Sequence, residues 1–551
     1  MKKRGIIALA LSLVMLVSLL AACGGDTSSS TSQPQQSSSQ TSSEPEAPEM
    51  VGNMYVEGLP IVEETQTFRI AVLNHAMDQK PFDQKAAVIA AEEATNVHIE
   101  WIPIPVGEGA EKINLMLATG DLPDAFLNAG LSDGALVQNL PAFQPLDELI
   151  AQYAPNVQAI YDEFPTVKAA LTQADGKMYS IMTGQMTNRD TTSGLTYINQ
   201  KWLDQLDLPM PTTVDELYDT LVAFRDNDPN GNGQKDEIPM AFCEKVWATF
   251  FEKYMAPWGI YRAGLRNETV IRDGEVLFSK SLPEFREALE FYNKLANEGL
   301  LDVEGFTQTE QQYAAKGQEG RYGVYLDYYP IYNAGEEYMN DYVVLLPLEG
   351  PNGVRVHDGN VGALKGTKTG FAITKNCENP EVLVRWIGYL NSSFEIKMEW
   401  DFGEKGIGWD GTEDEWWIPD GVEYPNGLDS TNYKFTEAMA ERTGKLLTQD
   451  EMMGMTYPDQ ESVNYKRMQQ VMEVEPFYPA ENYINIFEDA DTSARRSELF
   501  TEILAQVQTF TADAVVNGVT DESWQAYLSA LESLGVEEYT QMWQDYYDRT
   551  K

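Results

Sequence analysis

The chain has 551 residues, 43% of them hydrophobic, which is enough to bury the cores of roughly two or three domains. It carries 86 acidic side chains against 39 Lys and Arg, a formal net charge of −47. This excess excludes electrostatic binding to nucleic acid or to an anionic membrane surface. It also disfavours a highly anionic ligand unless a local cation or metal intervenes. The three histidines are scattered and form no zinc-binding pattern.

The N terminus has the organisation of a secretory signal peptide. Basic residues at positions 2–4 precede an apolar run over residues 6–20, and small side chains lead to Cys23. That run is shorter than the roughly 20 residues of a membrane-spanning helix. The Leu-Ala-Ala-Cys ending resembles the bacterial lipobox, which implies cleavage after residue 22 and a lipid, such as palmitate, on Cys23. An ordinary signal peptide is the alternative. Cys243 and Cys377 would then remain either as a disulfide or as two buried thiols.

We expect a disordered tether over residues 23–65, because its Ser-, Gln- and Pro-rich first half lacks the apolar side chains that a core needs. Beyond it, strand patterns over 67–73 and 97–104 alternate with helical patterns over 82–95 and 111–119. A third strand begins at Ala125. This order predicts an α/β fold with parallel strands and right-handed crossovers.

Several short motifs occur in an order typical of one family. Residues 115–124 read LMLATGDLPD, 175–179 read DGKMY, 197–203 read YINQKWL, and 403–407 read GEKGI. Together they resemble the extracellular solute-binding proteins of sugar ABC importers, in the branch that includes alginate-binding periplasmic proteins. The resemblance extends from about residue 66 to the C terminus.

The resemblance implies a two-lobed, periplasmic-binding-protein-like (type II) fold with a hinge between the lobes and a largely helical C-terminal part. The implied first lobe comprises residues 66–190 and 366–425, and the implied second lobe comprises residues 191–365 and 426–551. Such a protein captures an oligosaccharide in the cleft between its lobes and delivers it to the transmembrane subunits of an ABC permease. We expect a monomer at the extracellular face of the cell membrane, attached only through its lipid.

Two other functions remain open at this stage. A secreted glycoside hydrolase needs only two suitably spaced carboxyl groups, and carboxyl spacing cannot be read from sequence. A surface lipoprotein that binds glycans for adhesion or sensing would share all of these features without a permease. The resemblance favours transport and no enzymatic activity.

A loop over residues 226–239 predicts a calcium site. It reads DNDPNGNGQKDEIP and places oxygen-bearing side chains at alternate positions, as hard cations require. A register from Asp226 resembles an EF-hand; we prefer the register from Asp228, which resembles the calcium loop of the alginate-binding branch. A plain Asn-Gly-rich turn is the alternative. The ligands in the preferred register are Asp228, Asn230, Asn232, the Gln234 carbonyl, Asp236 and Glu237, which would form a structural clip. The helix before the loop begins at a Thr213 cap.

Aromatic residues in loop-like settings are candidates for sugar stacking, because the apolar face of a sugar ring packs on an aromatic face. The stacking candidates are Trp258, Trp400, Trp409 and Tyr328. The candidates for hydrogen bonds to sugar hydroxyls are Asp121, Asp124 and Arg321. The alternatives are that the aromatic rings pack in cores or lids, and that Asp121 only ends a helix.

Overall fold

The computed structural model of the chain divides into two units, residues 1–48 and 49–551. It describes residues 49–186, 194–262, 267–357, 364–419 and 421–550. The signal peptide, Cys23 and the first part of the predicted tether lie outside the described residues. Within the described ranges, no helix combines the length and the apolar character needed to cross a membrane.

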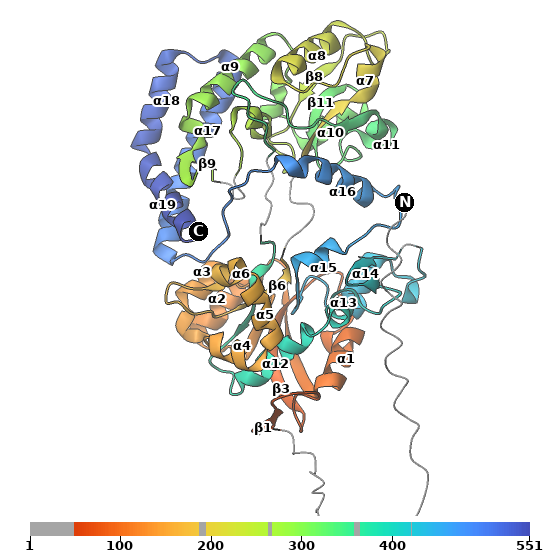
Figure 1. The fold of residues 1–551 in the computed structure, drawn as a ribbon, viewed down its shortest axis with the longest axis vertical. Coiled ribbons are helices and arrows are strands. Elements are labelled where there is room, and N and C mark those ends of the chain that lie inside the picture. Colours follow the sequence, from red (N-terminus) through yellow and green to blue (C-terminus); the bar gives the residue numbers. More distant parts are fainter. Residues whose placement is uncertain (1–48, 187–193, 263–266, 358–363, 420, 551) are drawn as a thin grey trace, which may run out of the picture. The chain divides into compact units, whose positions relative to one another are not determined.

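A six-stranded sheet forms the centre of the first lobe (Figure 1). In spatial order its strands are β16 (Leu446–Leu447), β6 (Ile181–Gln185), β13 (Thr367–Ile373), β5 (Ala125–Leu127), β3 (Gln66–Asn74) and β4 (Val97–Pro105). β13 runs antiparallel to β5 and β6, and the remaining neighbours are parallel. The carboxyl ends of all strands except β13 therefore meet at one edge of the sheet.

Short helices surround this sheet and share its core, because the central strands bury side chains on both faces; Phe68, Ile70, Ala71 and Val72 of β3 are all buried. The α-helices of the first lobe are α1 (Ala86–Thr95), α2 (Gly109–Thr119), α3 (Asp133–Gln138), α4 (Asp147–Tyr153), α5 (Pro155–Glu163), α6 (Pro165–Leu171), α12 (Pro380–Leu390), α13 (Phe394–Phe402), α14 (Ser430–Glu437) and α15 (Gln449–Met453). Its 3-10 helices are η1 (Phe82–Gln84), η2 (Leu140–Ala142) and η7 (Pro425–Gly427). Two hairpins accompany them, β1 (Met50–Val51) with β2 (Met54–Tyr55) and β14 (Asp410–Thr412) with β15 (Glu415–Trp417).

A four-stranded sheet forms the centre of the second lobe. In spatial order its strands are β12 (Tyr342–Val344), β7 (Leu195–Asn199), β11 (Tyr322–Asp327) and β8 (Ile238–Ala241). β8 and β11 are parallel, whereas β7 is antiparallel to β11 and β12. The carboxyl ends of β8 and β11 therefore lie at the edge where β7 begins.

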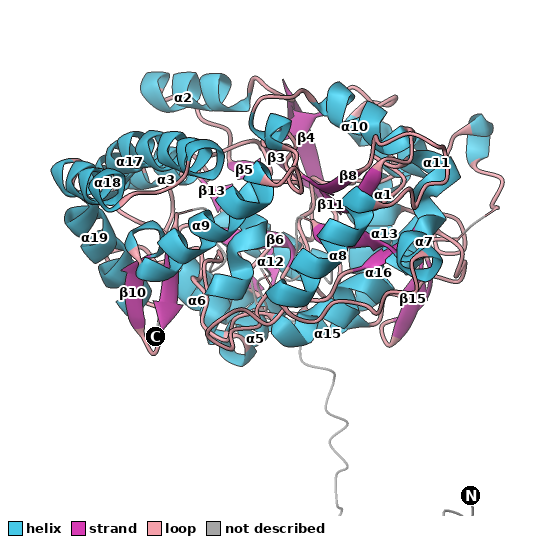
Figure 2. Ribbon diagram, turned by 90° about the horizontal axis from the view of Figure 1, so that it is seen from above, coloured by secondary structure: helices cyan, strands magenta, loops and turns pink. Residues whose placement is uncertain are grey.

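The second lobe is rich in helices, and its three last helices pack together, as Figures 1 and 2 both show. Its α-helices are α7 (Gln200–Gln205), α8 (Val214–Asp226), α9 (Pro283–Asn297), α10 (Glu310–Gln318), α11 (Gly335–Tyr338), α16 (Val463–Val474), α17 (Ala490–Asn517), α18 (Asp521–Ser533) and α19 (Val536–Asp548). Its 3-10 helices are η3 (Phe251–Trp258), η4 (Ser279–Ser281), η5 (Val303–Phe306), η6 (Met339–Asp341) and η8 (Glu475–Phe477), and β9 (Thr269–Arg272) pairs with β10 (Glu275–Phe278). The predicted helical C-terminal part is thus present.

The elements expected from the periodicity near the N terminus are found with small shifts at their ends. β3, α1, β4, α2 and β5 follow one another as predicted, except that the start of the first helix is the short η1. The predicted cap of α8 is also present, because the Thr213 hydroxyl accepts from the Glu216 N–H at 3.2 Å and the Glu216 carboxylate accepts from the Thr213 N–H at 3.2 Å. This reciprocal pair satisfies N–H groups that a helix start leaves without intrahelical partners.

One expected lobe boundary lies too early. The segment after residue 425 was assigned to the second lobe, but β16 pairs with β6 in the sheet of the first lobe. Met439 and Leu446 are buried in the same core. A two-residue strand is too short to give a sequence signal of its own. Of the two alternatives for the cysteines, the structure shows two buried thiols, because Cys243 and Cys377 are both free.

Prolines occupy one edge strand of each sheet. β4 ends the larger sheet and contains Pro103 and Pro105, and β8 ends the smaller sheet and contains Pro239. A proline cannot donate a backbone hydrogen bond, so it is tolerated at an edge and not in the middle of a sheet.

Candidate functional site

Three aromatic side chains gather where the parallel strands β8 and β11 end. Trp247 lies in the loop after β8, and Tyr328 and Tyr332 follow β11. The ring centroids of Trp247 and Tyr328 are 5.6 Å apart, and those of Tyr328 and Tyr332 are 5.9 Å apart. Trp247 is 59% exposed and Tyr332 is 57% exposed, so large parts of both rings face solvent. We call these three residues the aromatic platform.

The peptide groups on both sides of Tyr328 are held by buried side chains. Asp327 is 2% exposed and accepts hydrogen bonds from the backbone N–H of Tyr328 at 2.7 Å and of Asn333 at 3.2 Å. Arg467 of α16 donates to the Tyr328 carbonyl at 2.8 Å, and its guanidinium carbon lies 4.4 Å from the Tyr328 ring centroid. Tyr328 is therefore held in place before a ligand binds, which lowers the entropy that must be overcome at this position of the platform.

Asp327 should make stability depend on pH. Burial raises its pKa to about 7, against an unfolded value near 3.9. Because the folded protein holds this proton more tightly, its contribution to the free energy of unfolding should fall as pH rises from about 4 to about 7. We expect urea unfolding of Asp327→Asn and of the unmodified protein to show this: the unmodified protein should lose stability relative to the variant over that range. A constant difference would contradict the assignment.

The place and the chemistry of the platform both suit a sugar. In α/β sheets, ligands bind outside the carboxyl ends of parallel strands, where loops supply side chains and no strand blocks access. Aromatic faces give area for the apolar face of a sugar ring, and nearby polar groups can fix its hydroxyls. The platform is an exposed aromatic surface at that edge of the second sheet.

At the carboxyl edge of the first sheet lies a buried cluster of charges, which we call the Asp78 cluster. Asp78 Oδ1 accepts from Lys85 Nζ and from an Arg442 Nη, each at 2.7 Å, and Oδ2 accepts from the His75 N–H at 2.7 Å. The Asp78, Lys85 and Arg442 side chains are at most 3% exposed. Lys85 also donates to the Ala438 carbonyl at 3.2 Å. Burial lowers the Lys85 pKa to about 8. The cluster joins the end of β3 to α1 and to the segment after α14.

The three tryptophans expected to stack on sugar lie in cores. Trp258 is 2% exposed and packs on Phe291 and Tyr292, with centroids 5.1 and 5.6 Å away. Trp400 is 2% exposed and Trp409 is 0% exposed. None of these rings offers a face to a ligand in this structure. The geometry corresponds to the core-packing alternative that the sequence left open.

Two of the three expected hydrogen-bonding residues, Asp124 and Arg321, make contacts within the protein. Asp124 Oδ2 accepts from the Arg69 N–H at 2.7 Å, and exposed Asp121 follows the end of α2. Both precede β5 and so lie at the edge opposite the carboxyl ends of β3 and β5. Arg321 donates to the Asp236 carbonyl at 2.8 Å, which places it against the predicted calcium loop. Only Tyr328 of the seven predicted ligand residues belongs to the aromatic platform.

The predicted calcium loop connects α8 to β8, and its side-chain oxygens turn toward its own backbone. Asp228 accepts from the N–H of Asn232 at 3.1 Å and from that of Gly233 at 2.8 Å. Asn230 Oδ1 accepts from the Asn232 N–H at 3.0 Å, and Asn232 Oδ1 accepts from the Gln234 N–H at 2.7 Å. Gly233 has a φ of 76°, which permits the sharp turn expected of it. Gly231, at the sixth place of the other register, has a φ of 73°, so the turn is compatible with both registers.

Two carboxylates close this loop. Asp236 Oδ1 accepts from the side-chain amides of Asn230 at 3.3 Å and Asn232 at 3.0 Å. Both carboxyl oxygens of Glu237 are buried without a hydrogen-bond partner, and burial, with Asp236 and Asp228 nearby, raises the Glu237 pKa. No group of three or more His, Cys, Asp or Glu suited to a metal is found in the described part of the chain. A cation here would therefore also need the Asn and backbone oxygens.

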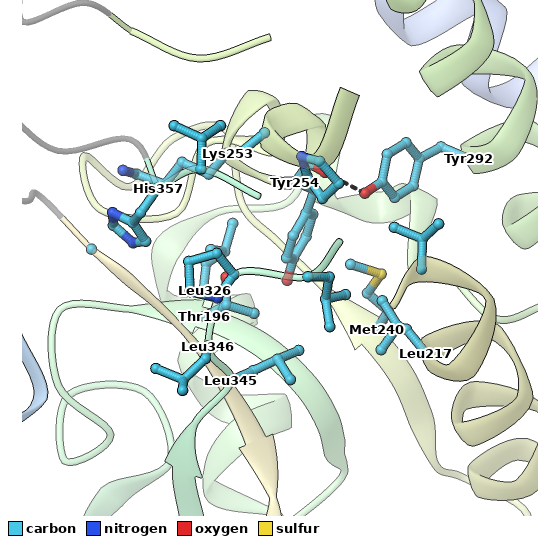
Figure 3. A pocket seen from close by; sticks show the side chains of 17 residues that line it. Thr196, Leu217, Met240, Lys253, Tyr254, Tyr292, Leu326, Leu345, Leu346 and His357 are labelled. Atoms are coloured by element: carbon cyan, nitrogen blue, oxygen red, sulfur yellow. Dashed lines mark hydrogen bonds between the residues drawn. The ribbon is translucent and has the colours of Figure 1, made fainter. Parts of the chain in front are cut away.

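A small apolar cavity lies deeper in the second lobe, lined by residues that include Met240, Tyr254, Leu326 and Leu345 (Figure 3). Tyr292 donates to the Tyr254 carbonyl beside it. Its volume is about 50 Å³, which holds a few water molecules and not a sugar ring.

Sequence reasoning missed Trp247 and Tyr332. Trp247 follows the short apolar run of β8 and lacks the glycine neighbours that drew attention to Trp409. A signal was available, because a tryptophan just beyond a predicted strand is a candidate for a strand-end site. Tyr332 stands four positions after Tyr328 in an aromatic run that was otherwise noticed.

Comparison of the chain with known proteins finds extracellular binding proteins. A family model described as bacterial extracellular solute-binding protein matches residues 78–393. The fructooligosaccharide ABC transporter substrate-binding protein FusA of Streptococcus pneumoniae is 28% identical over 505 residues, covering 89% of this chain and 91% of FusA. The structure of FusA in complex with kestose matches with a TM-score of 0.65 at 26% identity, over 88% of this chain and 99% of FusA.

Two further structures share the fold. An extracellular solute-binding protein from Bifidobacterium longum subsp. infantis matches with a TM-score of 0.72 at 25% identity, over 88% of this chain and 98% of that protein. The alginate-binding protein AlgQ2, in a structure without calcium ion, matches with a TM-score of 0.57 at 20% identity, over 88% of this chain and 99% of AlgQ2. The likeness to AlgQ2 supports the fold alone.

These matches confirm the predicted two-lobed, mixed α/β solute-binding fold. FusA is described as the substrate-binding protein of a fructooligosaccharide ABC transporter. The family model covers more than half of the chain. The chain therefore belongs to the bacterial extracellular solute-binding protein family.

Proposed function

We propose that this protein captures an oligosaccharide outside the cell and delivers it to the transmembrane subunits of an ABC importer. The observation that carries the proposal is the aromatic platform, a set of neighbouring and partly exposed rings at the carboxyl ends of β8 and β11. The relatives' descriptions, a fructooligosaccharide-binding protein and a complex with kestose, support the sugar class. The protein would release the sugar unchanged.

The attachment to the membrane rests on the sequence. The Leu-Ala-Ala-Cys ending supports a lipid on Cys23, and the low-complexity segment behind it supports a tether to the folded body. The protein would then stand at the extracellular face of the cell membrane as a monomer, with the lipid as its only membrane contact. Its net charge of −47 gives it no attraction to nucleic acid.

The proposal is tested with residues 49–551 and three oligosaccharide mixtures: fructooligosaccharides, human milk oligosaccharides and alginate oligosaccharides. Titration calorimetry should show saturable binding of one mixture, and mass analysis of the recovered ligand should show chains of unchanged length. Shortened chains would instead establish a glycoside hydrolase. Binding to none of the mixtures would remove the support for an oligosaccharide ligand.

We also propose that the loop over residues 228–237 holds a calcium ion as a structural clip. The Glu237 carboxyl, buried without a hydrogen-bond partner beside Asp228 and Asp236, is a group that a cation would satisfy. Asp228, Asn230, Asn232, the Gln234 carbonyl and Asp236 would complete an oxygen set of the kind that calcium prefers. A FusA structure is described as that of an EF-hand mutant, which supports a calcium loop in that relative.

Calcium should therefore raise the melting temperature. An ion present at about 100 times its dissociation constant stabilises the folded state by about 2.7 kcal/mol, which is several degrees for a protein of this size. We expect addition of EGTA to remove this increment in differential scanning fluorimetry. Glu237→Gln, which keeps the side-chain volume but removes the charge, should melt at the same temperature with calcium and with EGTA. An unchanged melting temperature of the unmodified protein would count against the clip.

A further inference from the structure

A short segment without helix or strand contacts the cores of both lobes. It comprises residues 483–488, between η8 and α17, and we call it the strap. Tyr483 and Ile486 are 2% and 5% exposed and belong to the core of the second lobe, whereas Phe487 is 1% exposed and belongs to the core of the first lobe. Ile484 packs against both cores. The side chains of one segment are thus divided between the lobes.

The second lobe fixes the strap through side chains of α17 and of the end of the chain. The Ile486 N–H donates to the Tyr546 hydroxyl at 2.8 Å, and Arg549 donates to the carbonyl of the following residue at 2.7 Å. The Glu488 carboxylate forms an ion pair with the Arg496 guanidinium. The backbone of the strap is therefore attached to the second lobe as well as its side chains.

The first lobe holds the same segment through Lys368, which lies on β13 and is 5% exposed. Its ammonium group donates to Asn485 Oδ1 at 3.0 Å and lies 4.3 Å from the centroid of the Phe487 ring. It also lies 2.7 Å from Asp133 Oδ2 of α3. A buried ammonium group is costly unless charged and polar partners compensate for the lost water. Lys368 receives part of this compensation from its own lobe and part from the strap.

We propose that the strap, anchored by Lys368, fixes the spacing between the two lobes. Packed cores resist continuous deformation, so a segment with side chains in both cores cannot follow one lobe without the other. Among the described contacts of Lys368, none involves the aromatic platform. Lys368 is thus a positioning residue. Its effect on sugar binding rests on the proposed function, whereas the spacing of the lobes can be measured without any sugar.

Paired spin labels measure this spacing. Ala159→Cys places a label on α5 of the first lobe and Ala526→Cys places one on α18 of the second lobe, both at exposed positions. The native thiols at positions 243 and 377 are buried, and a sample without the introduced cysteines shows whether they take up label. Pulsed electron paramagnetic resonance then gives the distribution of distances between the lobes.

Two substitutions weaken the anchor from its two sides. Lys368→Met removes the ammonium group and keeps an unbranched apolar chain beside Phe487. Asn485→Ala removes its acceptor in the strap at an exposed position, and so tests the same contact if Lys368→Met does not fold. Each should broaden the distance distribution. The double variant should broaden it no further, because both changes break one contact.

The matched control is a second buried lysine of the first lobe. Lys397 is 5% exposed and pairs with Glu451 at 2.7 Å, away from the strap. Lys397→Met should lower the melting temperature and leave the distance distribution as it is in the unmodified protein. An unchanged distribution in folded Lys368→Met or Asn485→Ala, or equal broadening in Lys397→Met, would overturn the role of the strap.

Sugar binding gives a separate readout. A ligand that contacts both lobes has to restore their spacing in the variant, so Lys368→Met should raise Kd by about fivefold or more. Titration calorimetry uses the mixture that the unmodified protein binds, with Lys397→Met again as the control. An unchanged Kd beside a broadened distribution would refute the effect on binding alone. If the unmodified protein binds none of the mixtures, the proposed function fails, and the distance measurement still decides whether the strap fixes the spacing.

Discussion

Replacement of Asp78 by alanine should lower the free energy of unfolding by about 3–5 kcal/mol, the usual effect of breaking a buried ion pair. Two buried cations, Lys85 and Arg442, share this one carboxylate, and all three side chains are at most 3% exposed. Without Asp78, both cations would be desolvated with no direct carboxylate contact in the cluster. Urea unfolding at pH 7 measures the loss.

The pH dependence of this loss distinguishes the electrostatic contribution of Asp78 to the free energy of unfolding from its packing contribution. Burial already lowers the Lys85 pKa to about 8, and removal of Asp78 should lower it further. Lys85 can then become neutral, so the cost of Asp78→Ala should be smaller at pH 9 than at pH 7.

Glu498→Ala breaks an exposed pair with Arg495 and should change stability by at most about 1 kcal/mol. Equal losses for the two variants would refute the role of the Asp78 cluster.

Trp247→Ala should weaken oligosaccharide binding by about 2 kcal/mol or more, roughly thirtyfold in Kd, as expected for an aromatic hot spot. The ring is 59% exposed in the free protein, so its removal should leave the melting temperature nearly unchanged. Titration calorimetry with the bound oligosaccharide gives the affinity, and scanning fluorimetry gives the stability.

The identity of the replacement provides the control for this result. Trp247→Phe keeps a flat ring 5.6 Å from Tyr328 in the present geometry and should retain most of the affinity. If the indole N–H acted as a hydrogen-bond donor to the sugar, Trp247→Phe would instead bind as weakly as Trp247→Ala. Wild-type affinity in Trp247→Ala would show that the sugar does not lie on the platform.

Several elements of both lobes were predictable, because their signals are local. The buried run of β3 and the Thr213 cap of α8 depend on residues adjacent in sequence. The turn that places the side-chain oxygens of Asp228 and Asn230 is local too, since its hydrogen bonds span at most five residues. Such features follow from periodicity and from the conformational needs of glycine.

The ligand-facing residues were predicted poorly, because exposure of an aromatic ring is decided by distant packing. Trp258 is buried by Phe291 and Tyr292, which come from a helix further along the chain. Trp247 instead meets Tyr328, about eighty positions away, only because β8 and β11 pair side by side in parallel. The position of Trp247 just after β8 gives a weak local signal, but the burial of Trp258 depends on residues more than thirty positions away in the chain.

The edge prolines bear on how such a protein behaves when many copies share one membrane surface. An unpaired edge strand can recruit the edge of a neighbouring molecule and start aggregation, a hazard that grows with crowding. Pro103, Pro105 and Pro239 interrupt the rows of donors along β4 and β8. If the proposed lipid concentrates the molecules in two dimensions, these two edges would meet without adding strand to strand, and each molecule would remain free to engage the proposed permease.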